Sequence, residues 1–154
     1  MNELAVIPFS SDLKSEFETI NKTWVQEYFT LEPFDIEQLE NPEKTIIETG
    51  GDIIFAKLGD EIVGTVGLAK VEEGVYEMVK MGVKQSAQGK GIGMFLGKAI
   101  IEKAKEMGGK KLVLYSSTKL QPALHIYKKL GFTESVPEAG KYCRCDVKME
   151  LNLD

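Results

Sequence analysis

Hydrophobic residues recur along most of the chain with a period of about two residues or of three to four residues. The period of two, or a continuous apolar run, predicts strands. Alternating or continuous apolar segments, rich in β-branched and aromatic residues, predict strands over residues 3–9, 52–58, 61–71, 74–83, 111–116, 132–136 and 141–151. Gly59-Asp60 separates two of these segments and predicts a hairpin between them.

The longer period, of three to four residues, predicts the helices. Ser10-Ser11-Asp12 supplies an N-cap for a first helix, and a short second helix is expected over 35–39. Later helices are expected from Ile92 to Met107 and from about Leu120 to Leu130. Gly108 and Gly131 directly follow these two helices, which is where glycine commonly ends a helix.

The order of the predicted elements indicates a fold class. A strand, two helices and three strands are followed by helix, strand, helix and two strands, without repeat or linker. The strand–helix–strand unit over 74–116 requires a parallel pair, because a helical crossover returns the chain in the same direction. We therefore expect one α+β domain over residues 1–154, with a mixed, mostly antiparallel sheet flanked by helices.

Composition excludes several classes of function. A single histidine and two cysteines cannot build a four-ligand zinc site, so no metal is expected. Cys143 and Cys145 stand too close in sequence to suggest a disulfide framework, which favours a reducing cytoplasm. No signal peptide and no apolar run of membrane-spanning length is visible, so we expect a cytoplasmic protein without a membrane partner.

The net charge of −5 hides an asymmetry between the two halves of the chain. Residues 1–79 hold 17 acidic residues against 5 lysines, whereas residues 80–154 hold 7 acidic residues against 14 basic ones. This asymmetry can mean simply that the protein has two solvated faces of opposite charge. Alternatively, the second half binds an anion and the first half faces a cation. With a single arginine in the chain, nucleic acid is not an expected partner.

A glycine-rich turn, Gln88-Gly89-Lys90-Gly91-Ile92-Gly93, lies between a predicted strand and the longest predicted helix. Glycines let backbone N–H groups converge, and a helix N-terminus adds unpaired donors, so such a turn suits a pyrophosphate. The spacing matches neither a Walker A loop nor a dinucleotide fingerprint. Without further motifs, a purely structural turn that helps the helix to pack remains an alternative.

Two motifs resemble those of one protein family and occur in the same order along the chain as in that family. Gln88-x-x-Gly91-x-Gly93 follows a strand ending at Val83, and Ala123-x-x-x-Tyr127-x-x-x-Gly131-Phe132 follows one strand later. Together with the element order, they make the chain similar to the GNAT superfamily of N-acetyltransferases. Two features depart from the family pattern: Lys84 to Ala87 replace a proline turn, and residues 117–122 contain no asparagine.

The resemblance implies acetyl-CoA as co-substrate, bound where the parallel pair splays apart. Backbone groups of Met81 and Val83 would pair with pantetheine like an added strand. Backbone N–H groups across the turn would hold the pyrophosphate, from the residues Gln88, Gly89, Lys90, Gly91, Ile92 and Gly93.

The implied chemistry is direct transfer of the acetyl group to an amine. Glu77 is the candidate general base, and simple alternation places it on one strand face with Val79, Met81 and Val83. Its other reading is a half-exposed strand glutamate. Tyr127 is the candidate acid that protonates the thiolate, although it also belongs to an apolar helix stripe. A backbone N–H near Met81 would stabilise the oxyanion.

The predicted activity is therefore acetyl transfer from acetyl-CoA to a primary amine, with the acidic first half favouring a small cationic acceptor. The family forms its acceptor pocket from the first helices and the last strands, here around residues 24–29 and 142–146. A protein or peptide amine is an alternative acceptor, and a non-catalytic acyl-CoA-binding module is an alternative function. An exposed strand edge near the C-terminus would permit a homodimer.

Overall fold

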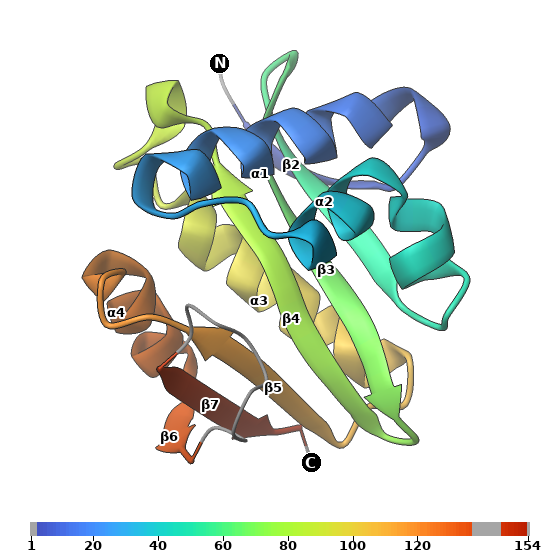
Figure 1. The fold of residues 1–154 in the computed structure, drawn as a ribbon, viewed down its shortest axis with the longest axis vertical. Coiled ribbons are helices and arrows are strands. Elements are labelled where there is room, and N and C mark those ends of the chain that lie inside the picture. Colours follow the sequence, from blue (N-terminus) through green and yellow to red (C-terminus); the bar gives the residue numbers. More distant parts are fainter. Residues whose placement is uncertain (1–2, 137–145, 154) are drawn as a thin grey trace.

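A computed structural model describes residues 3–136 and 146–153 and shows a single sheet in the order β1-β2-β3-β4-β5-β7-β6 (Figure 1). Among the strands of the described residues, only the β4–β5 pair is parallel, while the other neighbours pair antiparallel. The strands are β1 (Leu4–Pro8), β2 (Asp52–Leu58), β3 (Glu61–Glu72), β4 (Val75–Val83), β5 (Lys111–Ser116), β6 (Thr133–Ser135) and β7 (Val147–Asn152). This is the mixed sheet with one parallel pair that the sequence predicts.

Helices cover both faces of the sheet (Figure 1). The helices are α1 (Lys14–Tyr28), α2 (Pro33–Glu40), α3 (Ile92–Glu106) and α4 (Gln121–Leu130), with 3₁₀ turns at Ser11–Leu13 and Gln85–Ala87 and a π-helical turn at Glu43–Ile47. Helices α1 and α2 lie on one face, and α3 lies on the other. The long connection from β4 to β5 through α3 is the helical crossover that makes this pair parallel.

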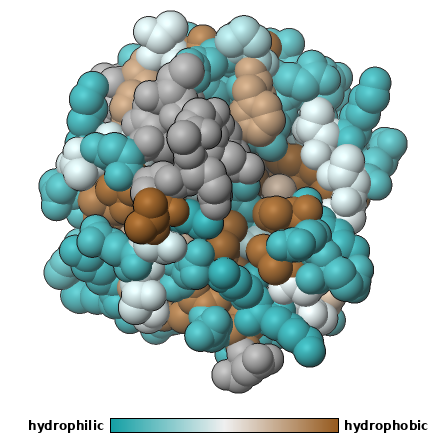
Figure 2. All heavy atoms as spheres, turned by 60° about the horizontal axis from the view of Figure 1, so that its bottom comes forward, coloured by the Kyte–Doolittle hydropathy of each residue, from teal (hydrophilic) through white to brown (hydrophobic). Residues whose placement is uncertain are grey.

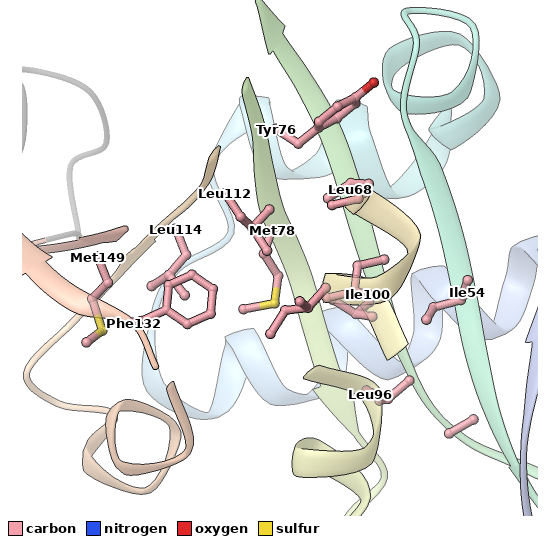
Figure 3. Packing of buried hydrophobic residues seen from close by; sticks show 14 of the residues in the cluster. Ile54, Leu68, Tyr76, Met78, Leu96, Ile100, Leu112, Leu114, Phe132 and Met149 are labelled. Carbon is pink, nitrogen blue, oxygen red and sulfur yellow. The ribbon is translucent and has the colours of Figure 1, made fainter. Parts of the chain in front are cut away.

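The hydrophobic core has two layers, one on each side of the sheet. On the α3 side, Leu68, Leu96, Ile100, Leu112 and Met149 are completely buried in one cluster (Figure 3). On the α1 side, a second cluster gathers Phe17, Ile20, Leu39, Ile46 and Phe55. Burying such a side chain contributes about 1.5–3 kcal/mol, so these layers fix the sheet against its helices.

Most predicted elements are observed, with boundaries moved by a few residues. The helix expected over 35–39 begins earlier, at Pro33, because proline suits the first helical turn. The last strand, expected over 141–151, is observed as Val147–Asn152; residues 141–145 lie outside the described part of the chain. The sequence pattern gave no indication of the π-helical turn that places Ile46 in the core.

A bulge in β4 corrects one prediction. Pairing with β3 passes from Gly67↔Val79 to Thr65↔Gly82, so Lys80 and Met81 together lie opposite Val66. Lys80 takes a φ of +55°, which is uncommon for a residue other than glycine. An extra residue shifts the two-residue alternation by one position.

The predicted common face of Glu77, Val79, Met81 and Val83 is therefore wrong beyond Val79. Val79 packs with Phe17 and Ile20 on the α1 side, and Glu77 shares that face by alternation. Met81 and Val83, after the bulge, pack against the α3-side core. One strand thus presents candidate site residues to both sides of the sheet.

Candidate active site

The parallel pair at the centre of the sheet opens after three residues. Strands β4 and β5 pair at Val75↔Lys111, Tyr76↔Leu112 and Glu77↔Val113, after which the two strands diverge although both continue (Figure 1). The part of β4 from Met78 onward consequently has no pairing with β5 along that edge. Unpaired strand edges offer backbone donors and acceptors to an extended ligand.

A cavity of about 530 Å³ lies at this opening and reaches both sides of the sheet. Residues of the α1–α2 side line one part, including Trp24, Phe29 and Gln38. Ile92, Gly93 and Tyr127 of α3 and α4 line another part. The volume falls in the range typical of small-molecule sites, and β4 runs between the two parts.

The glycine-rich turn forms one wall of the cavity. Gly89 and Gly91 have φ values of +82° and +77°, and a Cβ built at either position would meet no atom within 4 Å. Gly91 caps α3, and its carbonyl oxygen accepts a 3.0 Å hydrogen bond from the Phe95 N–H. The N–H groups of Ile92, Gly93 and Met94 precede that first bond, so they have no partner within the helix.

Gly93 serves a different purpose from the other glycines of the turn. Its Cβ would lie 3.0 Å from Cδ1 of Ile126, so glycine here allows α3 to approach α4 closely. Gly97, one turn later on α3, has the same role: a Cβ would lie 2.4 Å from Cδ1 of Leu130. The turn therefore combines a left-handed backbone at Gly89 and Gly91 with close helix packing.

The structure brings together nearly all the residues predicted to bind the co-substrate. The cavity lining includes Met81, Val83, Gln88, Gly89, Gly91, Ile92 and Gly93. Lys90 is different: its side chain is exposed and lines a second, separate hollow with Leu4 and Leu58. Any contribution of its backbone N–H to binding stays a prediction.

Tyr127 reaches the cavity from α4. Its ring packs edge-to-face against Phe132, with 6.1 Å between the centroids, and Gly131 ends the helix with a φ of +107°. Burial raises the pKa of the Tyr127 phenol to about 12. The phenol is therefore a neutral hydrogen-bond donor at physiological pH.

Glu77 lines the same cavity from the central strand. It is the last residue of β4 that pairs with β5, opposite Val113, so it lies where the two strands begin to separate. The residue is only 6% exposed, whereas a half-exposed strand glutamate was an alternative that the sequence allowed. Both predicted catalytic side chains thus line one cavity.

Sequence reasoning missed a buried ion pair beside this cavity. The Lys80 ammonium lies 2.5 Å from Oδ1 of Asp35 on α2, with exposed side-chain fractions of 7% and 1%. Asp35 also accepts a 3.1 Å hydrogen bond from the Glu32 N–H, which belongs to the capping box of α2. The sequence did contain one signal for a buried polar contact here. The polar residues Asp35 and Gln38 are three positions apart, which places them on one face of a short helix.

The loop between β5 and α4 forms the rim of the cavity. Ser117 and Lys119 line it, and the N–H and Oγ1 of Thr118 each donate a 2.9 Å hydrogen bond to the Asp146 carboxylate. These bonds hold the pKa of Asp146 below its usual value. Tyr142, an expected acceptor residue, lies outside the described residues.

Within residues 3–136 and 146–153, no three histidine, cysteine or acidic side chains are grouped as metal ligands would be. None of the helices in the same ranges has both the length and the apolar character needed to cross a bilayer.

A splayed parallel pair, a glycine turn at a helix N-terminus and one cavity lined from both faces of the sheet together characterise this fold. Residues 13–132 match the acetyltransferase (GNAT) family. The chain belongs to this family of acetyltransferases, as its two motifs predict.

Individual relatives agree with that assignment. The chain is 31% identical over 139 residues to the uncharacterized N-acetyltransferase YvbK of Bacillus subtilis, covering 79% of this chain and 90% of the relative. A GNAT-family acetyltransferase from Staphylococcus aureus Mu50 has a TM-score of 0.87 at 23% identity, covering 99% and 100% of the two chains. Spermidine N-acetyltransferase from Vibrio cholerae, solved with CoA and spermine, has a TM-score of 0.75 at 19% identity, covering 97% and 95%.

Proposed function

We propose that the protein transfers the acetyl group of acetyl-CoA directly to a primary amine, that of a small cationic molecule. One observation carries this proposal: a single cavity crosses the sheet where β4 and β5 separate, and both Glu77 and Tyr127 line it. Two substrates that enter from opposite faces can meet only in such an opening. Membership of the acetyltransferase family supports the same reaction class.

The residues of the α3 side fit acetyl-CoA. Its pyrophosphate matches the free N–H groups at the start of α3, with the turn glycines and the helix dipole as further support. Its pantetheine arm carries amides, which match the unpaired edge of β4 at Met81 and Val83. When bound, acetyl-CoA supplies an activated thioester.

The side chains supply the proton movements of the transfer. A bond forms between the amine nitrogen and the acetyl carbon while the bond from that carbon to sulfur breaks. The amine proton passes to the Glu77 carboxylate, directly or through one water, and the departing thiolate takes a proton from Tyr127. A backbone N–H near Met81, at the bulge, stabilises the negative charge on the carbonyl oxygen.

The α1–α2 side fits the acceptor. Trp24 offers an aromatic face to a cationic group, and the Glu77 carboxylate lies on this side of β4. The Phe29 ring already lies under the Lys119 ammonium, with 5.4 Å between the nitrogen and the ring centroid. The Lys80 charge is matched by Asp35, so this ion pair adds little net positive charge there. A GNAT neighbour of similar fold is solved with spermine, a polyamine, although at 19% identity that likeness extends only to the fold.

The test combines binding with turnover. Acetyl-CoA at about one hundred times its Kd raises the Tm by roughly 5–10 °C, given the linkage and size relations of small domains. A panel of polyamines, aminoglycosides, amino acids and a lysine peptide is then assayed through released thiol. Glu77→Gln and Tyr127→Phe each lower kcat by about a hundredfold without weakening acetyl-CoA binding.

Other outcomes point to different functions. Turnover of the peptide alone would place the activity on protein amines, and equal rates with cationic and anionic amines would remove the cationic preference. Binding of acetyl-CoA without turnover of any amine would indicate an acyl-CoA-binding module. If acetyl-CoA does not shift the Tm, the assignment of the cavity itself is wrong.

A further inference from the structure

The bulge of β4 lies in the wall of the cavity and has an unusual backbone. Lys80 and Met81 together face Val66 of β3, so one of the two falls outside the regular ladder. Lys80 has a φ of +55°, which residues with a Cβ seldom adopt. Lys80, Met81 and Gly82 all line the cavity. The strand therefore needs support from its surroundings to keep this shape.

The first turn of α2 supports the bulge through the Lys80 side chain. The Lys80 ammonium lies 2.5 Å from Oδ1 of Asp35 and 5.9 Å from the centroid of the Phe34 ring. Asp35 lies behind Lys80, outside the cavity lining, and closes the capping box of α2 with Glu32. Since both charged side chains are almost completely buried, solvent screens their attraction only weakly.

Helix α1 supports the bulge from a second direction. A Cβ built on Gly82 would lie 2.7 Å from Cδ1 of Trp24 and 3.0 Å from Cγ2 of Ile20, so the backbone at Gly82 touches α1 closely. The Trp24 indole is itself oriented, because its Nε1 donates a 3.0 Å hydrogen bond to the completely buried Asn21. Met81, between the two supported residues, turns to the other side and packs against the α3-side core.

The bulge also decides where the backbone N–H groups of β4 point. Along a regular strand these groups alternate between the two edges, so an extra residue changes which of them face β3 and which face the opposite edge. Beyond Glu77 that opposite edge no longer pairs with β5 and borders the cavity. A change in the bulge therefore turns the N–H donors near Met81 towards the cavity or away from it.

We propose that Asp35 is a positioning residue for the acetyl transfer: through Lys80 it holds the β4 bulge in the conformation that directs the Met81 N–H to the thioester carbonyl oxygen. This inference rests on the proposed function and names what holds its oxyanion donor in place. Stability alone gives no reason for a buried ion pair here, because apolar side chains of similar size often stabilise a core as well or better. An oxyanion donor, by contrast, must be held within about half an ångström of its productive position.

The first experiment compares two double variants that both lack the ion pair. Asp35→Asn/Lys80→Met keeps at position 80 a side chain that disfavours a positive φ, whereas Asp35→Asn/Lys80→Gly favours that backbone. The Lys80→Met double variant lowers kcat by about tenfold or more, while the KM of the amine and the Kd of acetyl-CoA stay within about threefold of wild type. The Lys80→Gly double variant recovers at least half of this loss on a logarithmic scale.

A core variant separates positioning from a general loss of stability. Met149→Ala truncates a completely buried side chain of β7 outside the cavity lining, so it lowers the Tm by several degrees. Assayed well below its Tm, Met149→Ala keeps the kcat of wild type. The proposal is overturned if kcat follows the Tm across all variants, or if the two double variants have the same kcat.

An NMR measurement tests the same inference without turnover. The amide proton of Met81 is followed in the complexes with CoA and with acetyl-CoA, which differ by the acetyl group alone. In wild type acetyl-CoA moves this proton downfield relative to CoA, because a hydrogen bond to the carbonyl oxygen deshields it. The displacement shrinks in Asp35→Asn/Lys80→Met and returns in Asp35→Asn/Lys80→Gly. Equal displacements in wild type and both double variants overturn the proposal.

The two readouts distinguish failure of this inference from failure of the proposed function. If amines are acetylated and both double variants keep the kcat of wild type, Asp35 does not position the donor and the acetyltransferase assignment stands. If no amine is acetylated, the proposed reaction fails, and the Met81 amide proton decides: a displacement that depends on the ion pair supports the held donor, and one that does not overturns it. If acetyl-CoA does not bind, both proposals fail.

Discussion

The ammonium of Lys80 and the carboxylate of Asp35 form an almost completely buried ion pair that joins the bulge of β4 to the first turn of α2. Lys80 also holds a left-handed backbone, with a φ of +55°. A non-glycine residue keeps that conformation only where its surroundings favour it. The ion pair is one such constraint, so it helps to hold the strand in the shape that puts Met81 on the α3 side.

Breaking this pair exposes its contribution to stability. Asp35→Asn keeps an acceptor for the Glu32 N–H but removes the negative charge of Asp35 from the buried Lys80 ammonium. We expect the free energy of unfolding to fall by about 3–5 kcal/mol, measured by urea denaturation. Adding Lys80→Met should restore more than half of that loss. The exposed pair between Lys105 and Glu102 provides the control, since Lys105→Met should change stability by about 0.5 kcal/mol or less.

The glycine turn allows a matched pair of substitutions. Gly91 and Gly108 have φ values of +77° and +84°, and neither has an atom within 4 Å of a built Cβ. Alanine at either position should cost about 1–2 kcal/mol of backbone strain. Only Gly91→Ala places a methyl group beside the N–H groups of the turn, so it alone should abolish the Tm shift caused by acetyl-CoA. Equal shifts in both variants would move the pyrophosphate site away from this turn.

The phenol of Tyr127 should act as a donor over the whole accessible pH range. Because its pKa is raised to about 12, it stays protonated below that pH, and no loss of kcat below pH 10 should arise from its ionisation. Tyr127→Phe should lower kcat by about a hundredfold. Tyr76→Phe is the control: its hydroxyl donates to the Met107 carbonyl oxygen at 3.3 Å, outside the cavity, so it should alter stability rather than kcat.

The Thr118–Asp146 contact should make the stability of the cavity rim depend on pH. The pKa of Asp146 is lower in the folded protein than in the unfolded chain, so its stabilisation is present above about pH 4 and is lost as the pH falls through the folded pKa. The Tm difference between wild type and Asp146→Asn should therefore be largest at pH 7 and shrink towards pH 3. A difference that does not vary with pH would exclude this contact as its source.

The sequence predicted the fold well wherever a single period governed an element. The parallel pair, the glycine ends of α3 and α4, and the turn that begins α3 all follow from local pattern and backbone chemistry. The bulge at Lys80 escaped because alternation assumes a regular strand, and the register is set by pairing with β3. The buried oxygen Oε1 of Gln38, which has no hydrogen-bond partner among the described residues, could not be predicted for a related reason: only tertiary packing decides whether a helix glutamine is buried.

The brevity of the β4–β5 pairing has a thermodynamic consequence. Three residue pairs, together with the α3-side core that contains Leu112 and Met149 and the packing of α4 on α3 around Gly97, join the part of the sheet formed by β5, β6 and β7 to the rest. On the face of the molecule shown in Figure 2, apolar side chains form separate patches among hydrophilic ones, so no continuous apolar surface is visible there. A ligand seated between the diverging strands acts as a cross-link, so amide protons of β5 and β7 should exchange more slowly as its concentration rises. Hydrogen exchange at β5 and β7 is thus expected to report binding of the proposed co-substrate.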